Sequence, residues 1–256
     1  MGSLKGFETE FAKIGFFIPP FVNFGTFSEI IEGSRTSQGR SQAHLESALK
    51  KIYTATHLAA MVISRYPQTP IIQHYKEIIS ESVEAHFLGL NHVAVAGLVP
   101  VIEGAARKLH ELFGLGNARK LELKPMLTTV LNYAKKETNR LKLGAYEEVE
   151  SMLDSFDHYL SQYLYTGSEK YSLADKTNRH GITHGSYADI DYGTPLNFYK
   201  VIGAVDVLCL VSSFQPLAPR NTPRSLSLAT YYLRLAEREK AGLRERIWTP
   251  LAIRNP

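Results

Sequence analysis

The sequence predicts an all-α protein, an antiparallel helical bundle, because apolar residues recur at helical spacing and strand patterns are nearly absent. From residue 41 to residue 215 the apolar positions follow one another at steps of three and four. Apolar residues make up 44% of the 256 residues, which is enough for a sizeable buried core. No period of roughly 20 to 50 residues repeats, so a bundle is expected rather than a solenoid.

Residues 1–40 show no helical period and are expected to form an irregular arm laid over the helical body. The segment is rich in phenylalanine, and Pro19-Pro20 and Gly25 interrupt it. Aromatic side chains at this density usually bury their rings in a core. Two alternatives are open for this arm, a small β element and a platform on which nucleic-acid bases stack.

Helices are expected wherever the spacing of three and four recurs between breaks at Pro67, Gly89, Gly114 and Gly167. Pro100 falls inside one of these segments and is expected to kink it. The predicted helices cover residues 41–66, 71–87, 92–113, 126–141, 147–165 and 196–214.

The end of the chain is expected to leave the bundle. Residues 216–256 contain a linker rich in proline, arginine and serine, followed by a helix near residues 226–246. This helix is expected to pack across the bundle or against a partner chain. The chain thus divides into the arm, the bundle over residues 41–215, and this C-terminal segment.

Composition narrows the class of protein. The 29 Lys and Arg against 25 Asp and Glu give a net charge of +4, compatible with an anionic partner but short of a dedicated nucleic-acid binder. One cysteine, Cys209, rules out a disulfide framework within the chain and a cysteine-based zinc site. The opening residues lack a secretory pattern, and the apolar run 201–211 contains Asp206 and is too short for a bilayer. A cytoplasmic protein without a membrane partner is expected.

The chemistry is concentrated in Asn178-Arg179-His180-Gly181-Ile182-Thr183-His184-Gly185. If this string begins a helix, Arg179 and His184 lie about 140° apart and flank a groove, whereas His180 and His184 share a face. A guanidinium that holds a phosphate, beside an imidazole that titrates near neutral pH, is sufficient to cleave a phosphodiester without a metal. These residue types suit RNA as substrate.

Neighbouring residues are expected to support the motif. Asn178 or Thr177 would cap the helix, which adds positive potential where a phosphate would bind. Asn178 would otherwise hydrogen-bond the phosphate itself. Asp189 and Asp191, with the tyrosines around them, are expected to hold the imidazoles. The supporting tyrosines are Tyr187 and Tyr192.

Glu103 has two interpretations. It precedes Arg107 by four residues, the spacing of a solvated pair along one helix. Its apolar and small neighbours instead suggest a partly buried carboxylate that needs a partner and would orient Arg179 or His184.

A basic helical face also has two interpretations, a solvated surface or a track for an RNA backbone. That face comprises Lys135, Lys136, Arg140 and Lys142.

At the motif the chain resembles the HEPN superfamily, the helical "higher eukaryotes and prokaryotes nucleotide-binding" domains. Arg179 and His184 match its Arg-x(4–6)-His signature, and the whole string is similar to a bacterial branch that reads Asn-Arg-His-x-Ile-Leu-His-Gly. The segment 85–104 is also similar to that branch. Together the resemblance covers roughly residues 75–215.

The resemblance implies a homodimer in which Arg179 and His184 of both copies face one another across a cleft. It implies metal-independent endoribonuclease activity, with no cofactor and no metal, in a toxin or phage-defence system that can include an antitoxin. One His184 would take the proton of the 2′-hydroxyl, Arg179 would neutralise the phosphorane, and the second copy's imidazole would protonate the leaving oxygen. His180 would tune or replace His184.

Three alternatives to this chemistry remain open. The protein could be a non-catalytic helical module that binds nucleotides or other proteins. His180 and His184 could hold zinc with a third ligand such as His158 or Asp191, although the glutamate of His-Glu-x-x-His is missing. The motif could also be purely structural, with Arg179 paired to Asp189 or Asp191.

Overall fold

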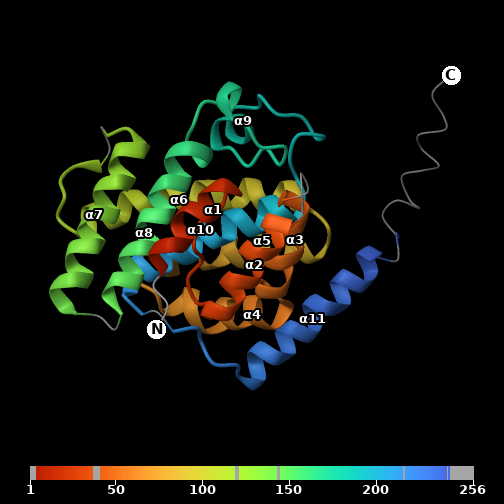
Figure 1. Ribbon diagram of the computed structural model, residues 1–256. Coiled ribbons are helices and arrows are strands. Elements are labelled where there is room, and N and C mark those ends of the chain that lie inside the picture. The colour runs from red at the N-terminus through yellow and green to blue at the C-terminus, as the bar shows by residue number, and fades with distance from the viewer. Residues whose placement is uncertain are drawn as a thin grey trace.

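The computed structural model of the protein describes residues 4–36, 41–118, 121–142, 145–215, 217–240 and 242, and these residues form helices and loops without a strand. The predicted all-α bundle is therefore confirmed. Figure 1 shows α10 in the middle of the bundle, α7 at one side, α11 along the outside and α9 at the top.

The helix bounds follow the apolar spacing closely in the centre of the chain and less closely at both ends. The α-helices are α1 (Phe7–Lys13), α2 (Phe24–Thr36), α3 (Ser41–Ile52), α4 (Ala55–Ala60), α5 (Lys76–Phe87), α6 (Asn91–Leu112), α7 (Leu123–Leu141), α8 (Tyr146–Tyr159), α9 (Arg179–Thr183), α10 (Pro195–Ser213) and α11 (Pro223–Lys240). Short 3-10 or π turns are η1 (Leu4–Gly6), η2 (Met61–Arg65), η3 (Tyr66–Gln68), η4 (Ile72–Tyr75), η6 (Leu160–Leu164) and η7 (Ser168–Lys170).

The bundle is built around α10. Every residue from 196 to 212 is buried, as expected for a helix that is apolar on all sides. Thr194 and Asn197 form a capping box at its start. By length and composition this 19-residue helix could cross a bilayer, contrary to the expectation from the shorter run 201–211, but 94% of its apolar window is buried inside the protein. It is the core helix of the bundle, with α3 and α6 packed against it.

The N-terminal arm is more regular than expected. Residues 7–13 and 24–36 are helical, and only the stretch between them is extended or turned. α1 was missed because its 7 residues leave too few turns to show a period, and α2 because Gly25 and Gly33, which are poor helix formers, lie within it. The β alternative is not observed in residues 4–36. The stacking platform is also wrong for Phe16 and Phe17, which are fully buried; Phe17 packs 5.0 Å from the Phe156 ring.

Three other boundaries differ from the prediction. The helix expected over 41–66 breaks at Tyr53, because the Thr54 side chain accepts from the His57 N–H and starts a new helix, α4. The helix expected from residue 147 continues beyond α8 as the turn η6, and the one expected from residue 71 begins as η4. The helix expected over 226–246 ends at Lys240, and its predicted last residues lie outside the described part apart from residue 242.

A buried carboxyl group lies in the middle of α10. Asp206 is 1% exposed, and the Tyr66 hydroxyl donates to its Oδ1 at 2.9 Å. Its Oδ2 has no hydrogen-bond partner among the described residues. Burial raises the pKa of Asp206 to about 8, although the Tyr66 hydrogen bond and the charge of Arg65 oppose that rise. The carboxyl group is therefore mostly protonated in the folded protein at neutral pH.

We expect this group to make the folded protein less stable as pH rises from about 4 to about 8. In that window the unfolded chain ionises Asp206 while the folded chain retains the proton, so the free energy of unfolding falls. Asp206→Asn removes the ionisable group. It should therefore abolish this fall in the free energy of unfolding, which is on the order of a few kcal/mol. Urea unfolding of both proteins between pH 5 and pH 8 measures it. Asp154→Asn, at an exposed position, should keep the wild-type slope; an unchanged slope in Asp206→Asn would contradict the assignment.

Candidate functional site

Asn178 fixes the start of the motif. It is fully buried, and its Oδ1 accepts from the Gly181 N–H at 2.9 Å, so the predicted N-cap of α9 is confirmed. Its Nδ2 donates to the carbonyl oxygens of Tyr163 and Thr166, both at 2.9 Å. Because all three bonds are internal, Asn178 anchors the motif to the end of η6 and does not reach a phosphate. The alternative cap, Thr177, instead donates its hydroxyl to Asp175.

A buried ion pair lies beneath the motif. Lys200 of α10 contacts Asp175 at 3.0 Å, and their side chains are 0% and 3% exposed. Burial alone would raise the pKa of Asp175, but Lys200 and donors including Thr177 outweigh it and lower that pKa. Asn197 joins the same network, since its Nδ2 donates to the Asp175 carbonyl at 2.5 Å. The segment before the motif is therefore tied to the central helix.

Gly181 allows close packing inside the motif. A Cβ at this position would clash with the ring of Tyr187, which lies against the α9 backbone. Tyr187 in turn donates to the Ser168 carbonyl at 3.4 Å. The glycine is thus required for the approach of Tyr187, which folds the loop after α9 back onto it.

Glu103, from the middle of α6, holds Arg179. Arg179 donates through Nε to Oε1 at 2.5 Å and through Nη2 to Oε2 at 3.5 Å. The side chains are 20% and 21% exposed. Arg107 does not complete the alternative helical pair, because it donates to the Ala118 carbonyl at 2.7 Å. Of the two interpretations of Glu103, the structure shows the partly buried carboxylate that orients Arg179.

The remaining nitrogen of Arg179 faces the imidazoles. Nη1 lies 2.8 Å from Nε2 of His184 and 3.4 Å from Nδ1 of His180. A guanidinium can only donate, so Nε2 of His184 accepts and a neutral ring carries its proton on Nδ1. The two imidazole rings are 5.7 Å apart and inclined by 27°. His180 and His184 therefore lie side by side. Arg179 separates this pair of imidazoles from Glu103.

The expectation that Arg179 and His184 flank a groove is wrong, because the two side chains are in contact. The helical estimate fails because α9 ends at Thr183 and His184 lies in the following turn. His184 is exposed, whereas His180 is partly buried. Burial lowers the pKa of His180, and the charges of Arg179 and His184 lower it further. His180 is therefore mainly neutral at pH 7.

Asp189 and Asp191 do not hold the imidazoles, contrary to the prediction. The Asp191 carboxylate accepts from the Ala188 N–H at 2.8 Å, and the Asp189 carbonyl contacts Nε2 of His92 at 3.0 Å. Neither forms the alternative ion pair with Arg179, whose partner is Glu103. The Asp191 carboxylate and the Asp189 carbonyl thus hold the loop that follows α9.

Two residues of this region were missed from the sequence. His92, at the start of α6, holds the loop through Asp189 and packs 4.8 Å from the Tyr192 ring. Tyr165 is 8% exposed, and burial and the charge of Glu103 raise its pKa. Its position at the end of a predicted helix, just before Gly167, was the only signal that it lies near the motif.

The zinc alternative finds no third ligand. Across the described residues, no group of three or more His, Cys, Asp or Glu side chains is arranged around a common point that suits a metal ion. His158 is exposed on α8, and Asp191 is engaged with the Ala188 backbone.

The basic face of α7 is partly neutralised. Lys135 pairs with Asp154 at 2.6 Å, and Arg140 pairs with Glu137. Lys142 donates to the side chain of Asn139 at 2.9 Å. Figure 1 also shows α7 well separated from α9. These observations favour the solvated surface over an RNA track.

Comparison with models of known protein families, with curated proteins and with solved structures finds no match for this chain. The resemblance to HEPN proteins stays a prediction from the sequence of the two segments described above, 178–185 and 85–104. The structure brings them together, since 85–104 ends α5 and forms the first half of α6, and its Glu103 contacts Arg179.

We expect Asn178→Ala to destabilise the protein by about 2 to 4 kcal/mol, because it removes the cap and leaves the Tyr163 and Thr166 carbonyls without their donor. Asn178→Asp keeps the cap acceptor but places a second oxygen against those two carbonyls in a fully buried position, so it should lose at least as much. Asn132→Ala, an exposed asparagine on α7, is the control and should have no measurable effect. Urea unfolding followed by circular dichroism provides the comparison; equal stability of all variants would contradict the anchoring role.

The imidazoles can be followed by NMR titration. We expect His180 to titrate below its ordinary pKa of 6.5, and Arg179→Gln to raise its pKa by removing a nearby positive charge. The same substitution at Arg140, on α7, should leave the His180 titration unchanged. A His180 pKa at or above 6.5 in the wild-type protein would show that the arrangement is different in solution.

Proposed function

We propose that the protein is a metal-independent endoribonuclease of the HEPN type that acts as a homodimer. The observation that supports this most directly is the contact between Arg179 and the exposed His184, with Glu103 holding the guanidinium from behind. Nη1 of a cation and Nε2 of an imidazole are thus placed 2.8 Å apart at the surface.

The Arg179–His184 contact suits a site that switches partners when substrate binds. Without substrate, Nη1 of Arg179 occupies the lone pair on Nε2 of His184. A phosphodiester oxygen is anionic and accepts from a guanidinium more strongly than a neutral imidazole does. Phosphate binding would therefore draw Nη1 away and release Nε2 to act as a base, while Glu103 keeps the guanidinium in place.

The proposed reaction is attack of a 2′-hydroxyl on the adjacent phosphorus. His184 of one copy takes the hydroxyl proton as the 2′-oxygen bonds to phosphorus. Arg179 neutralises the charge that develops on the phosphorane. The bond to the 5′-oxygen breaks, and the imidazole of the second copy donates a proton to that oxygen. The products carry a 2′,3′-cyclic phosphate and a 5′-hydroxyl.

A second copy is needed because each chain offers one exposed imidazole at this position, and an acid and a base must act on opposite sides of the phosphorus. Two exposed apolar side chains near the motif are candidates for the contact between copies. Ile190 is 95% exposed and Val93 is 61% exposed, and the contact of His92 with the Asp189 carbonyl brings their segments together.

The proposal extends to the setting that the HEPN resemblance implies. This is a cytoplasmic enzyme of a toxin or phage-defence system, whose partners are RNA and, in a toxin system, an antitoxin. The net charge of +4 is compatible with RNA as substrate.

One observation favours a second candidate, a non-catalytic module that binds nucleotides or proteins. Glu103 engages both Nε and Nη2 of Arg179 and neutralises much of its charge, which leaves a single nitrogen for a phosphate. In that case the motif would bind a phosphate group without cutting the chain.

Incubation of the purified protein with mixed RNA in EDTA tests the proposal. We expect cleavage with cyclic phosphate ends, reduced by about 100-fold or more in His184→Ala and in Arg179→Ala, because each removes one proton-transfer or charge-stabilising group. His158→Ala, an exposed histidine on α8, should cleave like the wild type.

Cleavage that persists in both variants would come from a contaminant and would overturn the proposal. RNA or nucleotide binding that depends on Arg179, without cleavage by the wild-type protein, would establish the second candidate instead.

A further inference from the structure

A cavity of about 350 Å³ lies away from the Arg179 motif. It is enclosed by the ends of α3 and α5, the start of α10, and α11. Its volume is in the range of small-molecule sites. No residue of the motif lines it. The cavity has an aromatic wall, two polar groups that form no hydrogen bond with other described residues, and balanced charge.

The aromatic wall is held rigidly by the core. The ring of Tyr199 from α10 lies parallel to Tyr53 from the end of α3, with centroids 5.7 Å apart and an angle of 10°. The His86 ring stacks on Phe198 at 4.0 Å and meets Tyr199 edge-on. Three of these rings, those of Tyr53, His86 and Tyr199, line the cavity. Because Tyr53 and Tyr199 are 2% and 3% exposed, a flat apolar ligand would meet only a small part of these two rings.

The His86 ring presents a hydrogen-bond acceptor to this wall. Its Nδ1 contacts Oδ1 of Asn91 at 2.7 Å, and because that oxygen accepts, Nδ1 carries the proton. Burial lowers the pKa of His86 to about 4, with Asn91 opposing and the charge of Lys50 adding to the fall. The ring is therefore neutral at pH 7. Its Nε2 has a free lone pair, makes no hydrogen bond within the described residues, and is not sealed in the core.

Tyr199 supplies the second polar group. Its hydroxyl also makes no hydrogen bond within the part of the chain that the structure describes, and it retains contact with solvent. Burial raises the pKa of Tyr199, and the charge of Glu46 raises it further, so the hydroxyl keeps its proton. The wall thus offers one acceptor at His86 and one hydroxyl at Tyr199.

The charges around the cavity favour a neutral ligand. Two carboxylates, Glu46 and Glu239, and two ammonium groups, Lys50 and Lys240, lie around it, so their formal charges cancel. An anion such as a nucleotide would gain little binding energy from a lining whose charges cancel. The cavity therefore differs from the motif, for which phosphate chemistry is proposed.

We propose that this cavity binds a small, neutral, planar heteroaromatic molecule whose ring N–H donates to Nε2 of His86 and which contacts the exposed parts of Tyr53 and Tyr199. The ligand would also touch α11, which supplies Leu233 and Glu239 to the lining. It would therefore bridge α11 to α5 and α10. The proposal does not depend on the ribonuclease activity.

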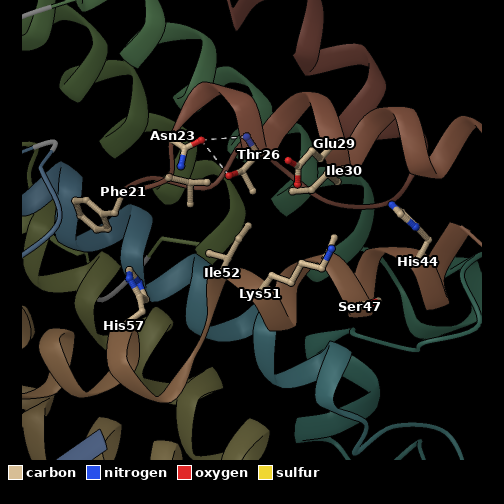
Figure 2. A pocket seen from close by; sticks show the side chains of 12 residues that line it. Phe21, Asn23, Thr26, Glu29, Ile30, His44, Ser47, Lys51, Ile52 and His57 are labelled. Atoms are coloured by element: carbon tan, nitrogen blue, oxygen red, sulfur yellow. Dashed lines mark hydrogen bonds between the residues drawn. The ribbon is translucent and has the colours of Figure 1, made fainter. Parts of the chain in front are cut away.

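Another cavity lacks these features. It measures about 290 Å³ and lies between α2 and α3, with Phe21 and His57 at one end and His44 at the other (Figure 2). Its Asn23 side chain already accepts from Thr26 through both N–H and hydroxyl at 3.1 Å. It has no wall of several parallel rings, and its His44 serves as a matched control, because His57 at the opposite end packs 6.0 Å from the Tyr53 ring.

Binding of benzimidazole at pH 7.5, measured by calorimetry, tests the proposal with the full-length protein. We expect saturable binding, and binding of 1-methylbenzimidazole about tenfold weaker, since methylation removes the N–H that donates to His86. His86→Phe keeps an aromatic ring without Nε2 and should weaken benzimidazole about tenfold as well. His44→Phe, at the end of the cavity of Figure 2 that is away from His57, should bind like the wild type.

Hydrogen exchange provides a second measurement that needs no variant. Benzimidazole should slow amide exchange in α11, because the ligand contacts its inner side. Absence of saturable binding, equal affinity for the two probes, or undiminished binding by a folded His86→Phe would each overturn the proposal. Should His86→Phe fail to fold, the pair of probes on the wild-type protein decides the question.

Discussion

The geometry of the motif depends on the buried ion pair between Lys200 and Asp175. Lys200 lies on the central helix and is completely buried, and an ammonium group in that position is very costly without a partner. Asp175, three residues before Asn178, supplies the opposite charge. Thr177, Tyr171 and Asn197 complete the hydrogen bonds around it. The pair therefore specifies where the chain meets α10 and from which point α9 starts.

From that anchor the site is assembled by two parts of the chain that are far apart in sequence. The Asp175 network and the Asn178 cap set the direction of α9, and α6 brings Glu103 to Arg179 across a separation of 76 residues. Glu103 leaves one nitrogen of the guanidinium for the imidazoles. The result is a cation with a fixed direction beside an exposed imidazole. Both the catalytic proposal and its non-catalytic alternative start from this arrangement.

Much of the fold was predictable because helical periodicity is a local property of the sequence. The spacing of apolar residues identified the segments that became α6, α7 and α10 to within a few residues. Short helices were harder. α1 was missed because it is short and α2 because Gly25 and Gly33 lie within it, and the break at Thr54 was missed because a single hydroxyl cap leaves the apolar spacing on either side unchanged. In the site, the cap role of Asn178 followed from its residue type and place.

The sequence by itself determined the all-α class, the apolar central helix and the string that carries Arg179, His180 and His184, because composition and local spacing specify these. Only the tertiary structure decided that Arg179 pairs with Glu103 rather than Asp189 or Asp191, and that Arg179 and His184 touch. It also decided that Tyr53, His86 and Tyr199 share one cavity beneath α11. Ion-pair partners and cavity walls depend on how distant helices pack, and no local pattern records that packing.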